Sequence, residues 1–423
     1  MTSPRTSSAR EEGGGLGVAA DELRRHNLAL LLDRLHLSGP LSRSELTAIT
    51  GLNRSTIADL IGELTALGLT QESPGLVASG PGRPSPVVRT RPEGAVVLAV
   101  ELGVDSFAVS TMGIGGHVFN RLRVARPRAR FSPQQTLQDV SKLAGPLLDA
   151  LPPGHVLCGV GVAVVGITRR ADGFVHFAPN LGWHDVPLAD LLATHLGIDV
   201  PVLVANDADL GALAEHRRGA GTGADHLIYV GGEMGIGIGV IIDGEPMLGA
   251  SGYAGEAGHM LINPAGVRCR CGSIGCWESE AGEAALLRRC SVSRSTGLRA
   301  MEAVETLAEA GDEAVLTALA ETGRWLGLGL ANLVNIFNPE LVVLGGLYHR
   351  FFSYLEATVT GTVSDRALEM AAARVTIRSS QLGSDAPLVG AAELALSDVI
   401  ADPGRSAAGR ATLRRRSRAT DRP

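Results

Sequence analysis

Short runs of β-branched and small apolar residues, separated by segments with helical spacing, dominate the chain from about residue 95 onward. Such runs are typical of strands that are buried on both faces, and the segments between them are long enough to form covering helices. We expect strands at 96–100, 107–110, 160–165, 202–204, 227–230, 238–242 and 341–344. We expect helices at 134–150, 187–196, directly after residue 207, at 301–338 and at 387–400. This alternation predicts an α/β architecture with mostly parallel sheets.

The block from residue 22 to about 70 has a different pattern and is predicted to form three helices. A Leu-rich first helix ends at Gly39-Pro40, a short second helix ends at Gly51, and the third ends near Gly68. Two helices joined by a tight turn form a helix-turn-helix, whose last helix enters the major groove of DNA. We predict that the polar residues at the exposed start of the third helix contact DNA: Asn53, Arg54, Ser55 and Thr56.

The segment 79–86, Ser-Gly-Pro-Gly-Arg-Pro-Ser-Pro, lies where a winged helix-turn-helix places its β-hairpin. Arg83 at its centre is predicted to enter a narrow minor groove. Taken alone, the segment fits a linker between domains equally well; the preceding helices favour the wing. Residues 1–91 contain ten Arg and nine Asp or Glu, a net charge of about +1. DNA affinity therefore has to come from local arginines and from dimerisation.

Four residues with metal-ligating side chains are closely spaced in the second half of the chain: His259, Cys269, Cys271 and Cys276. Three thiolates and one imidazole are the ligands of a closed tetrahedral zinc site. The intervening glycines let the backbone turn tightly enough to bring the sulfurs together. Since four protein ligands leave no position for water, we expect one structural Zn²⁺ per chain. Buried cysteines without a metal are the alternative, which the specific spacing disfavours.

Several polar residues suit recognition of a small polyol. Asn206 and Asp207 follow a predicted buried strand, where Asp207 can accept a hydrogen bond from a hydroxyl or act as a general base. An Asn-Asp pair at such a position often only caps a helix. Glu256 and Glu278 flank the predicted zinc loop, which would hold both carboxylates in fixed positions.

The sequence closely resembles the ROK family of repressors and sugar kinases, over roughly residues 22–400. The resemblance rests on Gly255-Glu256-Ala257-Gly258-His259, the spacing of the three cysteines with Glu278, Asn206-Asp207-Ala208, and Pro179-Asn180-Leu181-x-Trp183. It implies an actin-like, ribonuclease-H-like pair of α/β lobes with a sugar in the cleft between them. The candidate sugar contacts that it implies are Asn180, Asn206, Asp207, Glu256, His259 and Glu278. In kinase members the aspartate matching Asp207 is the catalytic base.

The resemblance and the sequence patterns together predict the domain organisation. We expect a disordered tail at 1–21, a winged helix-turn-helix domain at 22–90, a first lobe at 95–205 completed by the helix 387–400, a second lobe with the zinc loop at 206–386, and an Arg-rich disordered tail at 403–423.

The chain departs from the kinases at both phosphate loops. The first, Asp-x-Gly-Gly-Thr in kinases, is Glu101-Leu102-Gly103-Val104-Asp105, where Val104 blocks the backbone approach and Asp105 repels an anion. The second, Gly-Thr-Gly, is Glu233-Met234-Gly235. We therefore expect negligible ATP binding, and Asp207 to be a vestigial base without a catalytic role.

These patterns predict a cytoplasmic, sugar-responsive repressor of carbohydrate metabolism genes, with operator DNA and a sugar or sugar phosphate as partners. A homodimer or homotetramer would match a pseudo-palindromic operator. No apolar run is long enough to cross a membrane, and the first residues lack the apolar stretch of a signal peptide. The alternatives are an ATP-dependent sugar kinase with an appended DNA-binding domain, and a regulator that responds to a partner protein.

Overall fold

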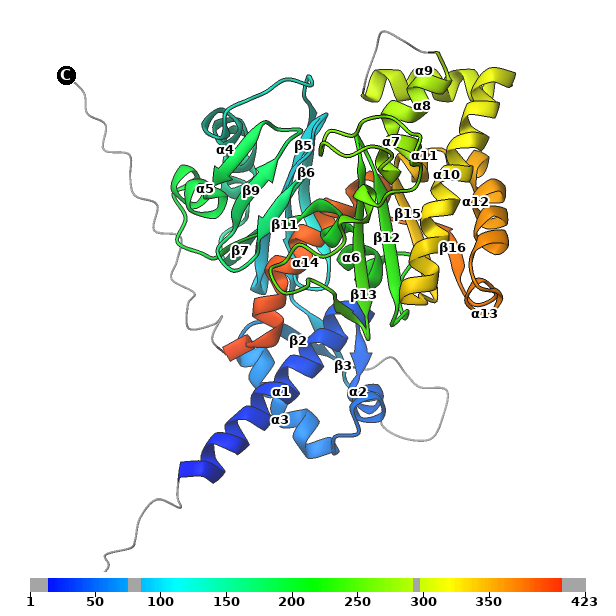
Figure 1. The fold of residues 1–423 in the computed structure, drawn as a ribbon. Coiled ribbons are helices and arrows are strands. Elements are labelled where there is room, and N and C mark those ends of the chain that lie inside the picture. The colour runs from blue at the N-terminus through cyan, green and yellow to red at the C-terminus, as the bar shows by residue number, and fades with distance from the viewer. Residues whose placement is uncertain (1–13, 75–84, 292–296, 405–423) are drawn as a thin grey trace, which may run out of the picture.

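The computed structural model describes residues 14–74, 85–291 and 297–404. Its amino-terminal part has three helices and a small sheet of strand order β1-β3-β2 (Figure 1). The elements are α1 (Gly14–Ser38), β1 (Leu41–Ser42), α2 (Arg43–Thr50), α3 (Arg54–Ala66), β2 (Thr70–Ser73) and β3 (Val87–Thr90). Antiparallel β2 and β3 flank the segment in which the wing was predicted. This helix and strand order is that of a winged helix-turn-helix, and we call it the winged block.

The helix boundaries of the winged block follow from its capping residues. Ser42 accepts a hydrogen bond from the Glu45 backbone and forms a capping box at the start of α2. Gly51 ends α2 in the left-handed conformation, with φ of 71°. Asn53 then caps α3 by accepting from the Thr56 backbone. These boundaries agree with the sequence prediction.

The predicted unstructured tail at 1–21 is wrong for its last residues, because α1 already begins at Gly14. The later turns of α1 are held by buried leucines. Residues 16–20, Leu-Gly-Val-Ala-Ala, contain no proline, so the helix continues from those turns toward the amino terminus. Residues 1–13 and 405–423 of the two predicted tails lie outside the described residues, as does Arg83.

The first lobe contains a five-stranded sheet of order β11-β7-β4-β5-β6. Its strands are β4 (Val96–Leu102), β5 (Ser106–Gly113), β6 (His117–Ala125), β7 (Leu157–Val164) and β11 (Val202–Asn206). One face packs on α4 (Pro133–Asp149) and α5 (Leu188–Leu196). The other packs on the last helix, α14 (Ala386–Ala401). A small sheet of β8 (Ile167–Arg169), β9 (Phe174–Ala178) and β10 (Trp183–Val186) lies beside it and was not predicted.

The second lobe contains a second five-stranded sheet, of order β14-β13-β12-β15-β16. Its strands are β12 (Leu227–Gly232), β13 (Ile236–Ile242), β14 (Glu245–Pro246), β15 (Leu341–Gly346) and β16 (Thr376–Ser379). Side chains alternate along β12: Ile228 and Val230 pack toward the outer helices, whereas Leu227 and Tyr229 pack toward α6 (Asp207–Arg218). The outer helices include α8 (Glu283–Arg289), α9 (Leu298–Glu309), α10 (Glu313–Phe337) and α12 (Phe352–Arg366). Shorter elements are η1 (Pro92–Gly94), η2 (Glu256–His259), α7 (Trp277–Ala281), α11 (Leu347–Arg350), α13 (Glu369–Ala372) and η3 (Gly383–Asp385).

Both large sheets are mixed, so the expectation of mostly parallel sheets is wrong. In the first, β4 pairs antiparallel with β5, and β5 with β6, while β7 pairs parallel with β4 and β11. The second repeats this arrangement, with β12 and β13 antiparallel and β12 and β15 parallel. The reason is that short turns can join only antiparallel strands, and such a turn follows β4, β5 and β12.

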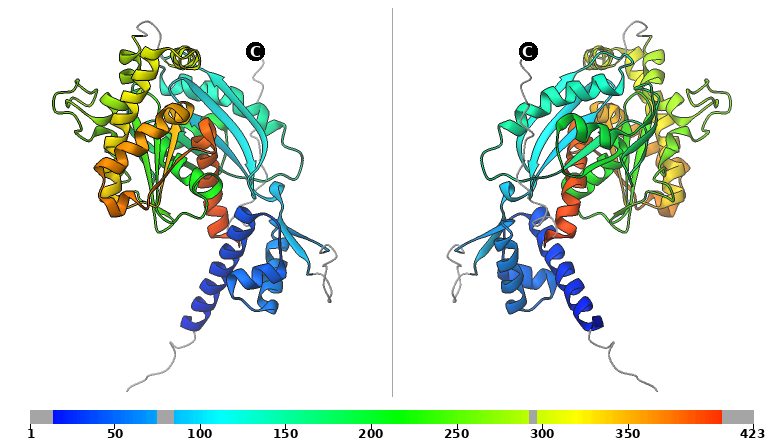
Figure 2. Two further views of the ribbon diagram at one scale, coloured as in Figure 1. Left: turned by 90° about the vertical axis from the view of Figure 1, so that its right-hand side faces the viewer. Right: turned by 90° about the vertical axis from the view of Figure 1, so that its left-hand side faces the viewer.

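Helices α6 and α14 lie between the two sheets and contact each other along their lengths (Figures 1 and 2). A Cβ at Gly390 of α14 would lie 1.9 Å from the Leu210 carbonyl oxygen of α6, so only glycine permits this approach. The hydrophobic core around α14 also includes Leu31 and Leu35 of α1. The winged block therefore packs directly on the helix that closes the first lobe. Within the described part of the chain, none of the helices is long and apolar enough to span a membrane.

Candidate functional site

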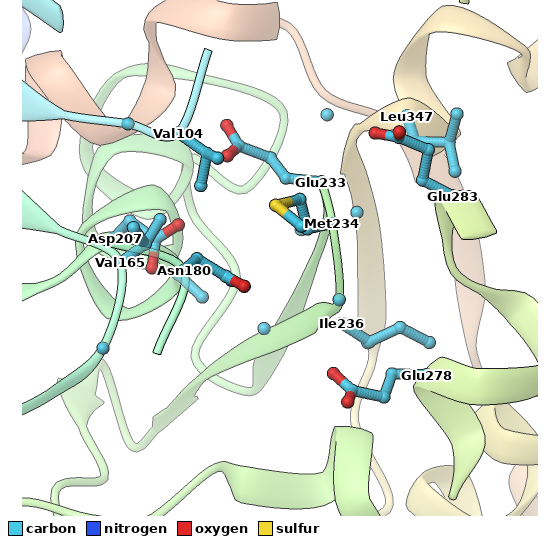
Figure 3. A pocket seen from close by; sticks show the side chains of 18 of the residues that line it. Val104, Val165, Asn180, Asp207, Glu233, Met234, Ile236, Glu278, Glu283 and Leu347 are labelled. Carbon is cyan, nitrogen blue, oxygen red and sulfur yellow. The ribbon is translucent and has the colours of Figure 1, made fainter. Parts of the chain in front are cut away.

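A cavity of about 1040 Å³ lies between the lobes, at the ends of β4, β11, β12 and β13. Figure 3 shows Asp207 and Asn180 on the side of the first lobe, Glu278 and Glu283 on the side of the second, and Glu233 between them. The cavity brings together all of the predicted sugar contacts, which are Asn180, Asn206, Asp207, Glu256, His259 and Glu278.

Asn206 and Asp207 form the junction between β11 and α6. Asn206 caps α6 by accepting from the Ala208 backbone at 2.8 Å, and its amide nitrogen donates to the Gly166 carbonyl at 3.0 Å. Both ends of this side chain therefore fix the local backbone. Asp207 is left facing the cavity. Burial, together with the charge of Glu101, raises the pKa of Asp207 to about 7. A carboxyl group that titrates near neutrality can exchange a proton with a bound hydroxyl.

Two further acids of the cavity were not predicted as ligand contacts. Asp209 lies on the same first turn of α6, and burial raises its pKa to about 7. Glu233 follows β12, and desolvation by the surrounding lobes, together with the charge of Asp207, raises its pKa to about 8. The cavity thus contains several carboxyl groups that hold protons close to neutral pH.

The four predicted metal ligands converge on one point. The ligand atoms of His259, Cys269, Cys271 and Cys276 all lie within 4.8 Å of one another. The Cys271 and Cys276 sulfurs are 3.6 Å apart, and the Cys269 sulfur is 3.7 Å from His259 Nδ1. A tetrahedral zinc with Zn–S bonds of about 2.3 Å has ligand–ligand distances of about 3.8 Å. The donor set and the distances therefore fit a zinc ion.

The imidazole of His259 connects the cysteine cluster to the cavity. Its Nδ1 faces Cys269, whereas its Nε2 lies 3.9 Å from Glu256. Glu278 accepts a hydrogen bond from the Cys269 thiol at 2.9 Å. Between the cysteines, Arg270 reaches the opposite lobe and donates to Asn180 Oδ1 at 2.7 Å. The loop that holds the cysteines therefore positions groups on both sides of the cavity.

The acids of the first phosphate-loop segment are paired with arginines. Asp105 forms a bidentate ion pair with Arg128 at 2.5 and 2.7 Å, and Arg128 also binds Glu283 of the second lobe at 2.7 Å. Glu101 binds Arg123 at 2.8 and 2.9 Å. The expected repulsion of an anion by Asp105 is therefore offset by Arg128. Arg128 thus links Asp105 of the first lobe to Glu283 of the second across the cavity.

The predicted DNA contacts lie together on the first turn of α3, remote from the cavity lining. Asn53, Arg54 and Ser55 are exposed, and Thr56 is half-buried. Asn53 Oδ1 is occupied by capping and by a hydrogen bond from Ser55 at 2.7 Å. Among these residues, Arg54 has the charged side chain that is directed to the surface without an ion-pair partner in the described parts of the chain.

Comparison with known proteins identifies the relatives of this arrangement. A family model described as "ROK family" matches residues 97–398. The chain belongs to the ROK family. It is 31% identical to the xylose repressor of Bacillus subtilis (strain 168) over 88% of this chain and 96% of that protein.

Solved ROK structures share the fold. A ROK family transcriptional regulator, described as a homologue of the E. coli MLC protein, superposes with a TM-score of 0.76 at 23% identity, covering 92% of this chain and all of that one. A ROK family glucokinase from Streptomyces griseus, in complex with glucose and AMPPNP, superposes with a TM-score of 0.60 at 28% identity. That match covers 71% of this chain and 98% of the glucokinase.

Two arginines that line the cavity, Arg123 and Arg128, were not predicted as site residues, and Arg123 lies in the unpredicted strand β6. Arg121 and Arg123 alternate with Leu122 and Val124 in β6, the period-two pattern of a strand, and this signal was available. The ion pair between Arg128 and Glu283 could not be predicted, because the two residues are 155 positions apart in the sequence.

Proposed function

We propose that this ROK protein is a sugar-responsive transcriptional repressor that binds operator DNA through the winged block and a sugar through the cavity between the lobes. The observation that carries the proposal is the combination, in one chain, of a winged helix-turn-helix with the sugar-site residues of the family. The similarity to a xylose repressor over nearly the full length of both proteins supports it.

In the proposed complex, α3 lies in the major groove and Arg54 contacts base edges or phosphates. Asn53, Ser55 and Thr56 contribute further polar contacts, and Arg83 enters the adjacent minor groove. A homodimer or homotetramer presents two such helices to a pseudo-palindromic operator. Because the winged block is close to neutral overall, its net charge contributes little to DNA affinity. Binding of two winged blocks to one operator supplies that affinity instead.

For the sugar, we propose that Asp207, Glu256 and Glu278 accept hydrogen bonds from hydroxyl groups, with Asn180 and His259 as further contacts. Asn206 acts mainly by holding Asp207 in place, as its capping hydrogen bonds indicate. Zn²⁺ held by His259 and the three cysteines has a structural role, because four protein ligands leave no position for a reacting water. It would fix the loop that orients Glu256 and Glu278.

We further propose that kinase activity has been lost. The support is the pair of arginine bridges, Arg128 with Asp105 and Glu283, and Arg123 with Glu101, in the half of the cavity where the kinase loops hold phosphates. The similarity to a glucokinase bound to a nucleotide analogue favours the alternative of a sugar kinase with an appended DNA-binding domain.

The test is selection of duplexes from a random DNA pool with the full-length protein, followed by titration of the selected duplex with and without D-xylose or D-glucose. We expect an inverted-repeat site and release by one of the sugars. Failure to enrich any sequence would contradict the repressor. Calorimetric titration with ATP and Mg²⁺ addresses the alternative, since micromolar binding of nucleotide would favour the kinase.

A further inference from the structure

A buried ionic cluster joins the winged block to the two helices that lie between the lobes. Glu393 of α14 is fully buried and accepts hydrogen bonds from His36 Nε2 at 2.9 Å, from Arg217 Nε at 2.8 Å and from Arg218 Nε. Arg217 also donates to Asp33 at 2.6 Å. Asp33 and His36 belong to α1, and the two arginines end α6. We call these five residues the joint.

The turn between β5 and β6 is also attached to the joint. The Gly115 backbone N–H donates to His36 Nδ1 at 2.8 Å, and His36 Nε2 lies 2.9 Å from Glu393 and 2.6 Å from Arg218 Nη2. A Cβ at Gly116 would lie 2.4 Å from the Arg218 guanidinium, and this residue has a φ of 79°. The chain therefore approaches Arg218 at a position where only glycine fits.

The joint compensates the buried negative charge of Glu393 through several partners. Burial alone would raise the pKa of Glu393, but the hydrogen bond from His36 and the charges of Arg218 and Arg217 outweigh it and hold this pKa far below its usual range. A buried carboxylate that loses one of these partners is left uncompensated, at a large cost in free energy. Displacement of Arg217 and Arg218 is therefore expected to displace α1 with them.

The opposite end of α6 is part of the cavity. The helix begins at Asp207 and ends at Arg218, and its twelve residues span about 17 Å. A Cβ at Gly239 of β13 would lie 2.4 Å from the Ala208 carbonyl oxygen, so the first turn of α6 packs directly on the second lobe. One rigid element thus contacts the cavity, the second lobe, α14 and the winged block.

We propose that α6 transmits occupancy of the cavity to the DNA-binding helices, with the joint as the point at which its movement reaches α1. This inference rests on the proposed function, because it requires one protein to bind both sugar and DNA. Figure 2 shows the arrangement, with blue α1 meeting red α14 where the winged block joins the lobes. A ligand that favours one position of Asp207 thereby favours one orientation of the winged block.

The first test needs neither sugar nor DNA and uses hydrogen–deuterium exchange of the full-length protein. Glu393→Gln would leave two guanidiniums without their buried partner and risks misfolding, so the principal variant is Asp33→Asn, at a side chain that is 29% exposed. Glu63→Gln is the matched control, because Glu63 is 32% exposed and also pairs with α1, through Arg24, but within the winged block.

We expect Asp33→Asn to raise exchange at residues 210–214 of α6 by roughly threefold or more, relative to wild type. Asp207→Asn, at the other end of the helix, should change exchange at residues 28–38 of α1 by a similar factor, and Glu63→Gln should change neither segment. If each variant alters exchange only beside its own site, the joint is structural and the inference is wrong.

The second test uses the duplex selected with the wild-type protein, with D-xylose as the sugar. Asp33→Asn should bind the duplex and D-xylose within about twofold of wild type, while the loss of DNA affinity caused by the sugar falls about fivefold or more. A full sugar effect in this variant would overturn the inference. If D-xylose does not affect the wild type, the same comparison is made with D-glucose; if neither sugar acts, the proposed sugar response fails instead, and the exchange measurement alone decides the role of α6.

Discussion

The raised pKa of Asp207 makes the stability of the protein depend on pH in a direction that one substitution can test. The pKa of this carboxyl group is about 7 in the folded chain, against 3.8 for the ordinary group. Below about pH 4 it is protonated in both the folded and the unfolded state. As the pH rises from 4 to 7, only the unfolded state loses the proton freely, so the folded state loses stability over that interval.

Asp207→Asn removes this penalty, because an amide does not ionise. Each unit of pKa difference corresponds to about 1.36 kcal/mol, which for the full shift gives about 1.7 kcal/mol at pH 5 and about 4.3 kcal/mol at pH 8. Asp207 is half-buried and faces the cavity, where solvent screens its charge, so we expect about half of each value. The variant should therefore be more stable by about 0.8 kcal/mol at pH 5 and about 2 kcal/mol at pH 8.

Thermal melting at the two pH values measures this difference. For a unit of roughly 150–250 residues, 1 kcal/mol shifts Tm by about 2–4 °C, so we expect a gain of about 4–8 °C at pH 8 and less than half of that at pH 5. Asp172→Asn is the control, since this carboxylate is exposed and paired with Arg169. A gain for Asp207→Asn that is equal at both pH values, or a loss at pH 8, would refute the assignment of the raised pKa to burial at this site.

Four other substitutions test the remaining parts of the proposal. Arg54→Ala should weaken binding to the selected duplex by about 5- to 100-fold in a mobility-shift assay and leave sugar binding intact; loss of both would mean that the winged block does not act separately. Cys271→Ser should reduce zinc from about one ion per chain to near zero by elemental analysis, and unchanged metal content would contradict the ligand set. Glu256→Ala should lower sugar affinity about tenfold or more by calorimetry while DNA binding persists, and unaltered sugar affinity would exclude this contact. Arg128→Gln leaves the carboxylates of Asp105 and Glu283 without their shared cation and should destabilise the protein by about 2 kcal/mol in thermal melts; an unchanged Tm would show that the bridge contributes little.

Local features of the fold could be predicted from the sequence because their causes are local. The sequence offers Ser42 or Ser44 as the cap of the second helix and places the start of the third at Asn53; in the structure Ser42 and Asn53 are the caps. The convergence of the three cysteines with His259 could be predicted from their spacing and from the glycines between them. Gly272 and Gly275 adopt positive φ values, which let the loop turn tightly enough to bring the sulfurs together. In each case the residues involved are close in the sequence.

Features that depend on packing between distant segments could not be predicted. The hydrogen bond between His36 and Glu393 joins residues 357 positions apart, and nothing near either residue in the sequence indicates its partner. The same holds for Arg128 and Glu283. The strand β6 was missed for a different reason: its alternating residues gave a signal, but a partly exposed edge strand lacks the continuous apolar run by which the buried strands were recognised.

The carboxylates of the cavity fall into two groups, and this division bears on why the protein would respond to a neutral sugar. Glu101 and Asp105 have arginine partners, so each already has a cation as hydrogen-bond donor, although burial still raises the pKa of Glu101. Asp207 and Glu233 have raised pKa values that burial causes, and no described arginine forms an ion pair with either. The lobes remove water from Asp207, which leaves its carboxyl group short of hydrogen-bond partners. A sugar hydroxyl that donates to Asp207 would restore a hydrogen bond, and so stabilise the ligand-bound state relative to the empty one. Because Asp207 is also the first residue of α6, the free energy gained there acts on the helix that reaches the winged block.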